Sequence, residues 1–336
     1  MEEATGAERQ GEEIAVHQQF KLQTISSNGI RVRAAVQGEG PLVIMVHGWP
    51  ELWYSWRHQI KVIAEAGYRV VAPDVRGYGG SACPHEVEAY DMTSLMGDVV
   101  GLIDAYGEQQ AILIGHDWGA PIVWNTAALH APRVAAVAGL SVPYRPRGEL
   151  STIALWRKLF HDKFFYQVYF QQEGVAEAEL AADVRTSLRK IYYAGSGDVA
   201  NADAWINRAP ADNLLEGFVD PDPFPDWLSD DDLDYLVANF VQSGFRGAIN
   251  RYRNQQRDFD MLPTMGAAPI EQPSCFIAGS KDLVRSFVRP LDPYEDVASH
   301  CRDFRGKTII EGAGHWVQQE APAEVNAALL SFLGSL

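Results

Sequence analysis

Asp117 is the residue whose setting points most directly to chemistry. It is the centre of Gly115-His116-Asp117-Trp118-Gly119, which has the Gly-x-nucleophile-x-Gly spacing of a tight strand-to-helix turn, with Asp where Ser is common. Only Gly tolerates the crowding beside such a turn. A carboxylate that attacks a saturated carbon forms an ester, which water can cleave, whereas a serine would form a stable ether. The motif predicts displacement at carbon followed by hydrolysis; the alternative is an Asp that caps the next helix.

Two further segments predict partners for this nucleophile. The second step needs a base that activates water, and a His–carboxylate pair supplies one. Asp282 follows the apolar run 274–278 and His315 follows Thr308-Ile309-Ile310, so both are expected at the same rim of a sheet, in the order typical of the α/β-hydrolase fold. The alternatives are a helix N-cap for Asp282 and an ordinary loop position for His315. His116, the rival base, is expected to be structural because the turn directs the neighbours of a nucleophile away.

A third segment predicts an oxyanion hole. His47-Gly48-Trp49-Pro50 follows the apolar run 41–46, and a backbone N–H from this loop normally joins that of the residue after the nucleophile. Trp49 and Trp118 are therefore the expected donors to the tetrahedral oxyanion. Pro50 is expected to fix the loop through a cis Trp49–Pro50 bond.

Short apolar runs alternate with helix-length segments along much of the chain, which indicates a parallel sheet buried on both faces. The alternation stops after Pro143 and resumes at Ser274. We therefore expect a single α/β core, formed by residues 16–143 and 264–336, with a helical cap inserted at 144–263 over the carboxyl ends of the strands. Residues 1–15 are expected to be a disordered acidic leader.

Composition excludes several classes of function. The chain has 336 residues, 47% of them hydrophobic, and a formal net charge of −16, which argues against nucleic acid or an anionic membrane as partner. No apolar run reaches the length of a membrane span. The three cysteines form no CxxC pair, which fits reduced thiols in a cytoplasmic protein. Oligomeric state stays open, with a homodimer among the alternatives.

Four segments resemble motifs of soluble epoxide hydrolases of the α/β-hydrolase fold, in particular the single-domain microbial and plant forms. They are the HGxP-like 47–50, the nucleophile motif 115–119, and the cap segments 165–179 and 244–254. Trp49 stands where the family commonly has Phe. The resemblance covers nearly the whole chain after residue 15 and implies an α/β-hydrolase core with an inserted cap.

The resemblance also implies two epoxide-binding tyrosines, which fall on Tyr166 and Tyr252. Ring opening produces an alkoxide, which needs a proton donor, and a tyrosine is a neutral donor at pH 7. Tyr169 lies one helical turn from Tyr166 and is a competing candidate. The alternative for both tyrosines is packing within the cap.

Together these features predict an epoxide hydrolase that converts a small apolar epoxide and water to a vicinal diol, with no metal or organic cofactor. The expected pocket residues are Trp49, Pro50, Trp118, Gln167, Phe170 and Trp316. The closest alternative is a dehalogenase, which would use the same Asp-His-Asp set with N–H donors around a halide. A serine esterase is disfavoured because the chain contains no GxSxG, and a non-catalytic ligand-binding relative would commonly lack one of these three residues.

Overall fold

The computed structural model describes residues 16–200 and 202–336, so the predicted leader 1–15 lies outside the described residues. Its centre is one eight-stranded sheet in the order β1-β2-β4-β3-β5-β6-β7-β8. Only the pairs β1–β2 and β2–β4 are antiparallel; the other neighbours are parallel. The strands are β1 (Lys21–Ser27), β2 (Ile30–Gln37), β3 (Leu42–Val46), β4 (Arg69–Pro73), β5 (Ala111–His116), β6 (Val134–Leu140), β7 (Ile270–Gly279) and β8 (Cys301–Ile310).

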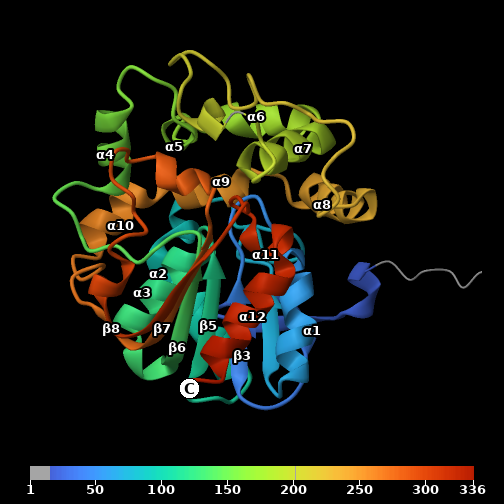
Figure 1. The fold of residues 1–336 in the computed structure, drawn as a ribbon, viewed down its shortest axis with the longest axis vertical. Coiled ribbons are helices and arrows are strands. Elements are labelled where there is room, and N and C mark those ends of the chain that lie inside the picture. Colours follow the sequence, from blue (N-terminus) through green and yellow to red (C-terminus); the bar gives the residue numbers. More distant parts are fainter. Residues whose placement is uncertain (1–15, 201) are drawn as a thin grey trace, which may run out of the picture.

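Helices cover both faces of the sheet, which explains why the central strands are apolar without alternation (Figure 1). In β3, Ile44 and Val46 pack into the core cluster that contains α2 (Met92–Ala105) and α3 (Gly119–Leu129). Val43 and Met45 pack into the opposite cluster with α1 (Arg57–Glu65) and α12 (Pro322–Leu333). Both faces of central strands such as β3 and β5 therefore lose water contact on folding.

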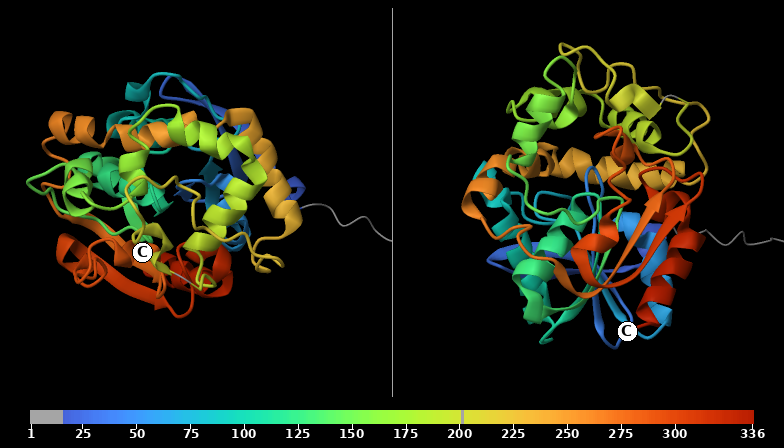
Figure 2. Two further views of the ribbon diagram at one scale, coloured as in Figure 1. Left: turned by 90° about the horizontal axis from the view of Figure 1, so that it is seen from above. Right: turned by 60° about the vertical axis from the view of Figure 1, so that its left-hand side comes forward.

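The chain leaves the sheet after β6 and returns at β7, and the segment between forms a layer above the carboxyl ends of the strands (Figures 1 and 2). Its helices are α4 (Thr152–Leu159), α5 (Tyr166–Tyr169), α6 (Val175–Ala182), α7 (Val184–Gly195), α8 (Asp230–Ser243), α9 (Arg246–Arg253) and α10 (Gln255–Met261). This is the helical insertion that the break in alternation predicts. No helix within residues 16–200 and 202–336 is long and apolar enough to cross a membrane.

Local turn chemistry also follows the sequence. β1 and β2 form a hairpin, and both residues of its Asn28-Gly29 turn have positive φ, 47° and 77°, as a two-residue hairpin turn requires. The short helix α11 (Val317–Glu320) begins two residues after His315, with Trp316 as its N-cap.

Candidate active site

Asp117 lies at the sharp turn between β5 and α3, with φ of 48°. Non-glycine residues seldom adopt this left-handed conformation, although Asp tolerates it better than most. The glycines around it are required by close backbone approach: a Cβ on Gly48 would lie 2.3 Å from Cβ of Asp117, and a Cβ on Gly119 would lie 2.0 Å from the carbonyl oxygen of Val46. The turn therefore holds the carboxylate against the loop that follows β3.

The structure brings His315 and Asp282 to this carboxylate. Nε2 of His315 lies 3.4 Å from Oδ2 of Asp117, and its Nδ1 lies 3.1 Å from Oδ1 of Asp282. Oδ1 of Asp282 also accepts the backbone N–H of Val284 at 3.0 Å. Asp282 therefore caps the helix that follows it and contacts His315 at the same time, because one carboxylate can accept from both groups.

Ser141 is a neighbour of this pair that the sequence did not indicate. Its Oγ lies 2.9 Å from Nδ1 of His315, and its backbone has φ of 67° just after β6. Nδ1 therefore faces two oxygen atoms from two different strand ends. This fixes the ring so that Nε2 points at Asp117.

Charge in the buried site controls the protonation of these groups. Burial opposes the charged form of His315, but the carboxylates of Asp282 and Asp117 outweigh it and raise the pKa of His315 well above its usual value. Burial likewise raises the pKa of Asp282, but the charge and hydrogen bond of His315 dominate and lower it. The resting arrangement is an imidazolium between two carboxylates.

The two predicted oxyanion donors lie on different segments, Trp49 on the loop after β3 and Trp118 directly after Asp117. The backbone N–H of Trp49 donates to Oδ1 of Asp117 at 2.7 Å, and the Trp49–Pro50 peptide bond is cis as expected. Trp118 is the N-cap residue of α3, and the first N–H groups of a helix have no partner within it, so its backbone N–H is oriented to serve an oxyanion at Asp117. The two carboxylate oxygens of Asp117 therefore have different surroundings. Oδ1 accepts from the N–H of Trp49, and Oδ2 faces His315.

His116 is structural, as the geometry of the turn predicts. Its side chain is fully buried; Nδ1 lies 2.7 Å from Oε2 of Glu51 and Nε2 lies 2.7 Å from the carbonyl oxygen of His315. Glu51 also accepts the backbone N–H of Gly48 at 2.8 Å. These contacts of Glu51 and His116 join the loop after β3, the end of β5 and the loop that contains His315. The role of Glu51 could not be predicted from the sequence, because its partner His116 lies 65 positions away.

Glu51→Gln is expected to lower the free energy of unfolding by about 3 kcal/mol at neutral pH, since it removes one partner of a buried pair. Burial raises the pKa of Glu51, but the charge of His116 and its hydrogen bond outweigh this and lower the pKa to about 2. The stabilisation is therefore present above the usual glutamate range and lost as the pH falls towards 2. Urea unfolding at several pH values measures it, with exposed Glu311→Gln as control. Equal stability of the two variants at neutral pH would contradict the prediction.

The two predicted tyrosines approach Asp117 from the cap. Tyr166, the first residue of α5, lines with Asp117 a cavity of about 330 Å³. Tyr166, Tyr252 of α9, Asp117 and His315 also line a smaller void of about 20 Å³. Tyr169 does not join them, because its hydroxyl donates to Oε2 of Glu179 at 2.8 Å. Burial raises the pKa of Tyr166 and of Tyr252 well above the usual tyrosine value, so both hydroxyls stay protonated at neutral pH.

The predicted pocket residues divide into two groups. Trp118 and Gln167 line the larger cavity, and Trp49 and Trp316 line the smaller void. Pro50 and Phe170 line neither of them, so their assignment to the pocket wall needs correction. Phe170 is fully buried and packs its ring behind Trp49, Tyr166 and Tyr252. The carbonyl of Pro50 is occupied by the hydroxyl of Tyr192, at 3.1 Å.

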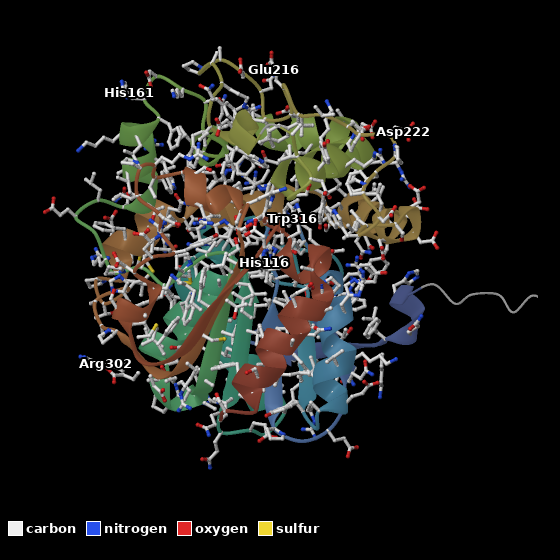
Figure 3. The ribbon with its side chains drawn as sticks, in the orientation of Figure 1. His116, His161, Glu216, Asp222, Arg302 and Trp316 are labelled. Carbon is white, nitrogen blue, oxygen red and sulfur yellow. The ribbon has the colours of Figure 1, made fainter. Side chains whose placement is uncertain are left out.

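The site lies where sheet and cap meet. Figure 3 shows His116 and Trp316 at this boundary, while His161, Glu216 and Asp222 lie at the outer rim of the cap. A larger groove of about 910 Å³ lies between α4 and the segment 286–300, but neither Asp117 nor the two tyrosines line it. The volume of a cavity is therefore no guide to where Asp117 and the two tyrosines lie.

The eight-stranded, mostly parallel sheet, the helical insertion between β6 and β7 and the tight turn at Asp117 define an α/β-hydrolase, and the family model described as "alpha/beta hydrolase fold" matches residues 41–322. Epoxide hydrolase A of Mycobacterium tuberculosis is 44% identical over 93% of this chain and 97% of its own. The crystal structure of epoxide hydrolase A from Mycobacterium thermoresistibile superposes with a TM-score of 0.88, at 44% identity, over 94% of this chain and 98% of its own. Potato epoxide hydrolase I gives 0.85 at 32% identity, over 94% and 100%. The chain belongs to the epoxide hydrolases of the α/β-hydrolase fold.

Proposed function

We propose that the enzyme opens its epoxide through a covalent ester on Asp117 and hydrolyses that ester with water activated by His315. The observation that carries the proposal is the position of Asp117, which has His315 on one side and lines the same void as Tyr166 and Tyr252. A nucleophile, a base and two neutral acids thus share one buried space. These are the groups that the two steps require.

In the first step, Oδ2 of Asp117 attacks one ring carbon from the side opposite the breaking C–O bond. Oδ1 is held by the N–H of Trp49, which leaves Oδ2 as the attacking atom. The ring oxygen takes a proton from Tyr166 or Tyr252. Because burial keeps both tyrosines protonated, each can donate throughout the neutral pH range.

In the second step, His315 removes a proton from water, which attacks Cγ of Asp117. The oxyanion develops at Oδ1, where the N–H groups of Trp49 and Trp118 stabilise it. The bond between Cγ and Oδ2 then breaks, and the departing diol oxygen takes the proton from His315. The protons balance over the cycle. When Asp117 becomes an ester, His315 gives its resting proton to the phenolate left by ring opening. After the diol departs, the proton on the Asp117 carboxyl passes to His315, which restores the starting state.

Alkylation itself prepares the base for this step. In the free enzyme, Asp117 is one of the two carboxylates that raise the pKa of His315. Esterification removes that negative charge, so the pKa of His315 falls and the neutral imidazole becomes available to deprotonate water. Ester hydrolysis is therefore expected to slow as the pH falls, while ring opening does not require neutral His315.

A single turnover in heavy-oxygen water tests the covalent route. With enzyme in excess, the first diol is expected to carry no label, and one labelled oxygen is expected in Asp117, located by peptide mass spectrometry. Label in the first diol would exclude the ester. Halide release from a 1-haloalkane without diol formation from epoxides would instead establish a dehalogenase, with the tyrosines as packing residues.

Tyr166→Phe and Tyr252→Phe are each expected to lower kcat/KM for diol formation by about 10²–10³-fold, the cost of one preorganised donor to a developing oxyanion. The double variant is expected to lose more than either single one. Stopped-flow measurement of ester formation checks this, and Tyr169→Phe is the matched control because its hydroxyl contacts Glu179. Full ester formation by the double variant would contradict a role as acids.

We further propose that the substrate is a small, largely apolar epoxide. Trp118, Pro121, Val142, Val284 and Phe287 contribute apolar surface to the 330 Å³ cavity. Polar groups of Asn125, Arg251 and Gln255 lie along the same wall. A volume of this size accommodates one ring system with a short substituent.

A further inference from the structure

A chain of buried hydrogen bonds leads to the hydroxyl of Tyr166. Nε2 of Gln167 lies 2.8 Å from the oxygen of Tyr166, and Oε1 of Gln167 accepts from two groups: the indole N–H of Trp156 at 3.0 Å and the amide of Gln255 at 2.6 Å. All four side chains are more than nine-tenths buried. They come from α4, α5 and α10, so the chain joins three helices of the cap.

The indole of Trp156 fixes the direction of every bond in this chain. An indole N–H can only donate, so the atom of Gln167 that faces it must be the carbonyl oxygen. The other end of the same amide, its NH₂ group, must then face Tyr166. Gln255 must also present its NH₂ group, because the oxygen of Gln167 has no hydrogen to give. The orientations of both amides are therefore fixed by Trp156, whose indole N–H can donate a hydrogen bond but cannot accept one.

The oxygen of Tyr166 is consequently an acceptor on the side of Gln167. Its own proton is not needed there and is left for an acceptor in the cavity that Tyr166 shares with Asp117. As the proton moves to the ring oxygen, negative charge grows on the phenol oxygen, and the N–H of Gln167 is already aimed at it. Burial raises the pKa of Tyr166, and the bond from Gln167 acts in the opposite direction.

We propose that Gln167 is a positioning residue that orients the proton of Tyr166 towards the epoxide and stabilises the phenolate left by its transfer, with Trp156 and Gln255 holding the amide in the required direction. The proposal rests on the proposed function of Tyr166 as an acid. It assigns to Gln167 a role beyond lining the pocket.

The same chain of hydrogen bonds also links the segments that carry the two tyrosines. Gln255 follows Tyr252 by three residues, at the start of the helix after α9, so its bond to Gln167 ties the segment of one tyrosine to that of the other. Gln171, one turn beyond Gln167, donates to the backbone carbonyl of Tyr252 at 3.0 Å. Gln171 therefore ties the segment after α5 to α9 without touching a phenol hydroxyl, which makes it a matched control.

A double-mutant cycle on ester formation tests the proposal. Gln167→Ala is expected to slow ester formation about tenfold in the wild-type background, the effect of one lost hydrogen bond to a developing charge. In the Tyr166→Phe background it is expected to change the rate less than twofold, because the oxygen it serves is gone. Gln171→Ala is expected to have the same effect in both backgrounds. An equal effect of Gln167→Ala in both backgrounds would overturn the positioning role.

A measurement without turnover separates this proposal from the reaction it serves. With tyrosine labelled at Cζ, the hydroxyl proton of Tyr166 can be assigned by its loss in Tyr166→Phe. Gln167→Glu replaces the donor with an acceptor, so the hydroxyl is expected to reverse towards the carboxylate and its proton resonance to shift downfield. No shift in a folded variant would overturn the proposed bond direction. Absence of diol from the wild-type enzyme, with this shift present, would refute the proposed function instead.

Discussion

Asp117→Asn is expected to lower diol formation by about four orders of magnitude or more, the loss typical when a covalent nucleophile is removed. An amide oxygen is a far poorer nucleophile than a carboxylate, so the first step stops. Asn is the replacement of choice because it tolerates the φ of 48° at this position and can still accept from the N–H of Trp49. Product formation from a saturating epoxide, followed by chromatography of the diol, gives the rate.

The control for this variant is its fold. Its urea midpoint should stay close to that of the wild type, because the close approach of Gly48 depends on the shape of the Asp117 side chain, which the amide retains. Diol formation at a tenth of the wild-type rate or above would mean that water opens the ring directly, and Asp117 would then be a structural or electrostatic group.

His315→Gln is expected to form the ester but to hydrolyse it about a thousandfold more slowly, within the range for loss of a general base. No part of an epoxide departs in the first step. Intact-protein mass should therefore rise by the full mass of the substrate and stay raised. In the wild type the same species should be short-lived at neutral pH and persist longer as the pH falls, because protonated His315 cannot take a proton from water.

Asp282→Asn gives a graded comparison. Asp282 orients His315 and stabilises the imidazolium that forms when water is deprotonated, so the ester of the Asp282→Asn variant should persist for an intermediate time. A His315→Gln enzyme that turns over at the wild-type rate, with no increase in mass, would show that another group activates the water.

The strands and the catalytic order could be predicted from sequence because their signals are local. Apolar runs such as 111–116 are buried whole, and a glycine on each side of Asp117 marks the turn whatever surrounds it. Asp282 and His315 follow strand ends, so the parallel topology alone brings them to one rim. The two tyrosines could be assigned only from the resemblance to epoxide hydrolases, because their spacing in the sequence did not distinguish Tyr166 from Tyr169.

The supporting contacts could not be predicted because each depends on residues far apart in the chain. Glu51 meets His116 across 65 positions, and Ser141 meets His315 across 174. Gln167 was expected only as pocket wall, since the indole that fixes its amide lies in another helix. Phe170 was misplaced for the same reason: an aromatic residue beside a site can form its wall or support that wall from behind, and only packing decides.

The core and the cap contribute to different bonds, and this division has an evolutionary consequence. Asp117, Asp282, His315 and the oxyanion donors belong to the core, whereas Tyr166 and Tyr252 belong to the insertion between β6 and β7. In the mechanism that we propose, the core would form and cleave the alkyl ester, and the cap would select the leaving atom by the donors it presents. A lineage could therefore change the leaving group by substitutions in the insertion alone, while inheriting the hydrolytic half of the reaction unchanged.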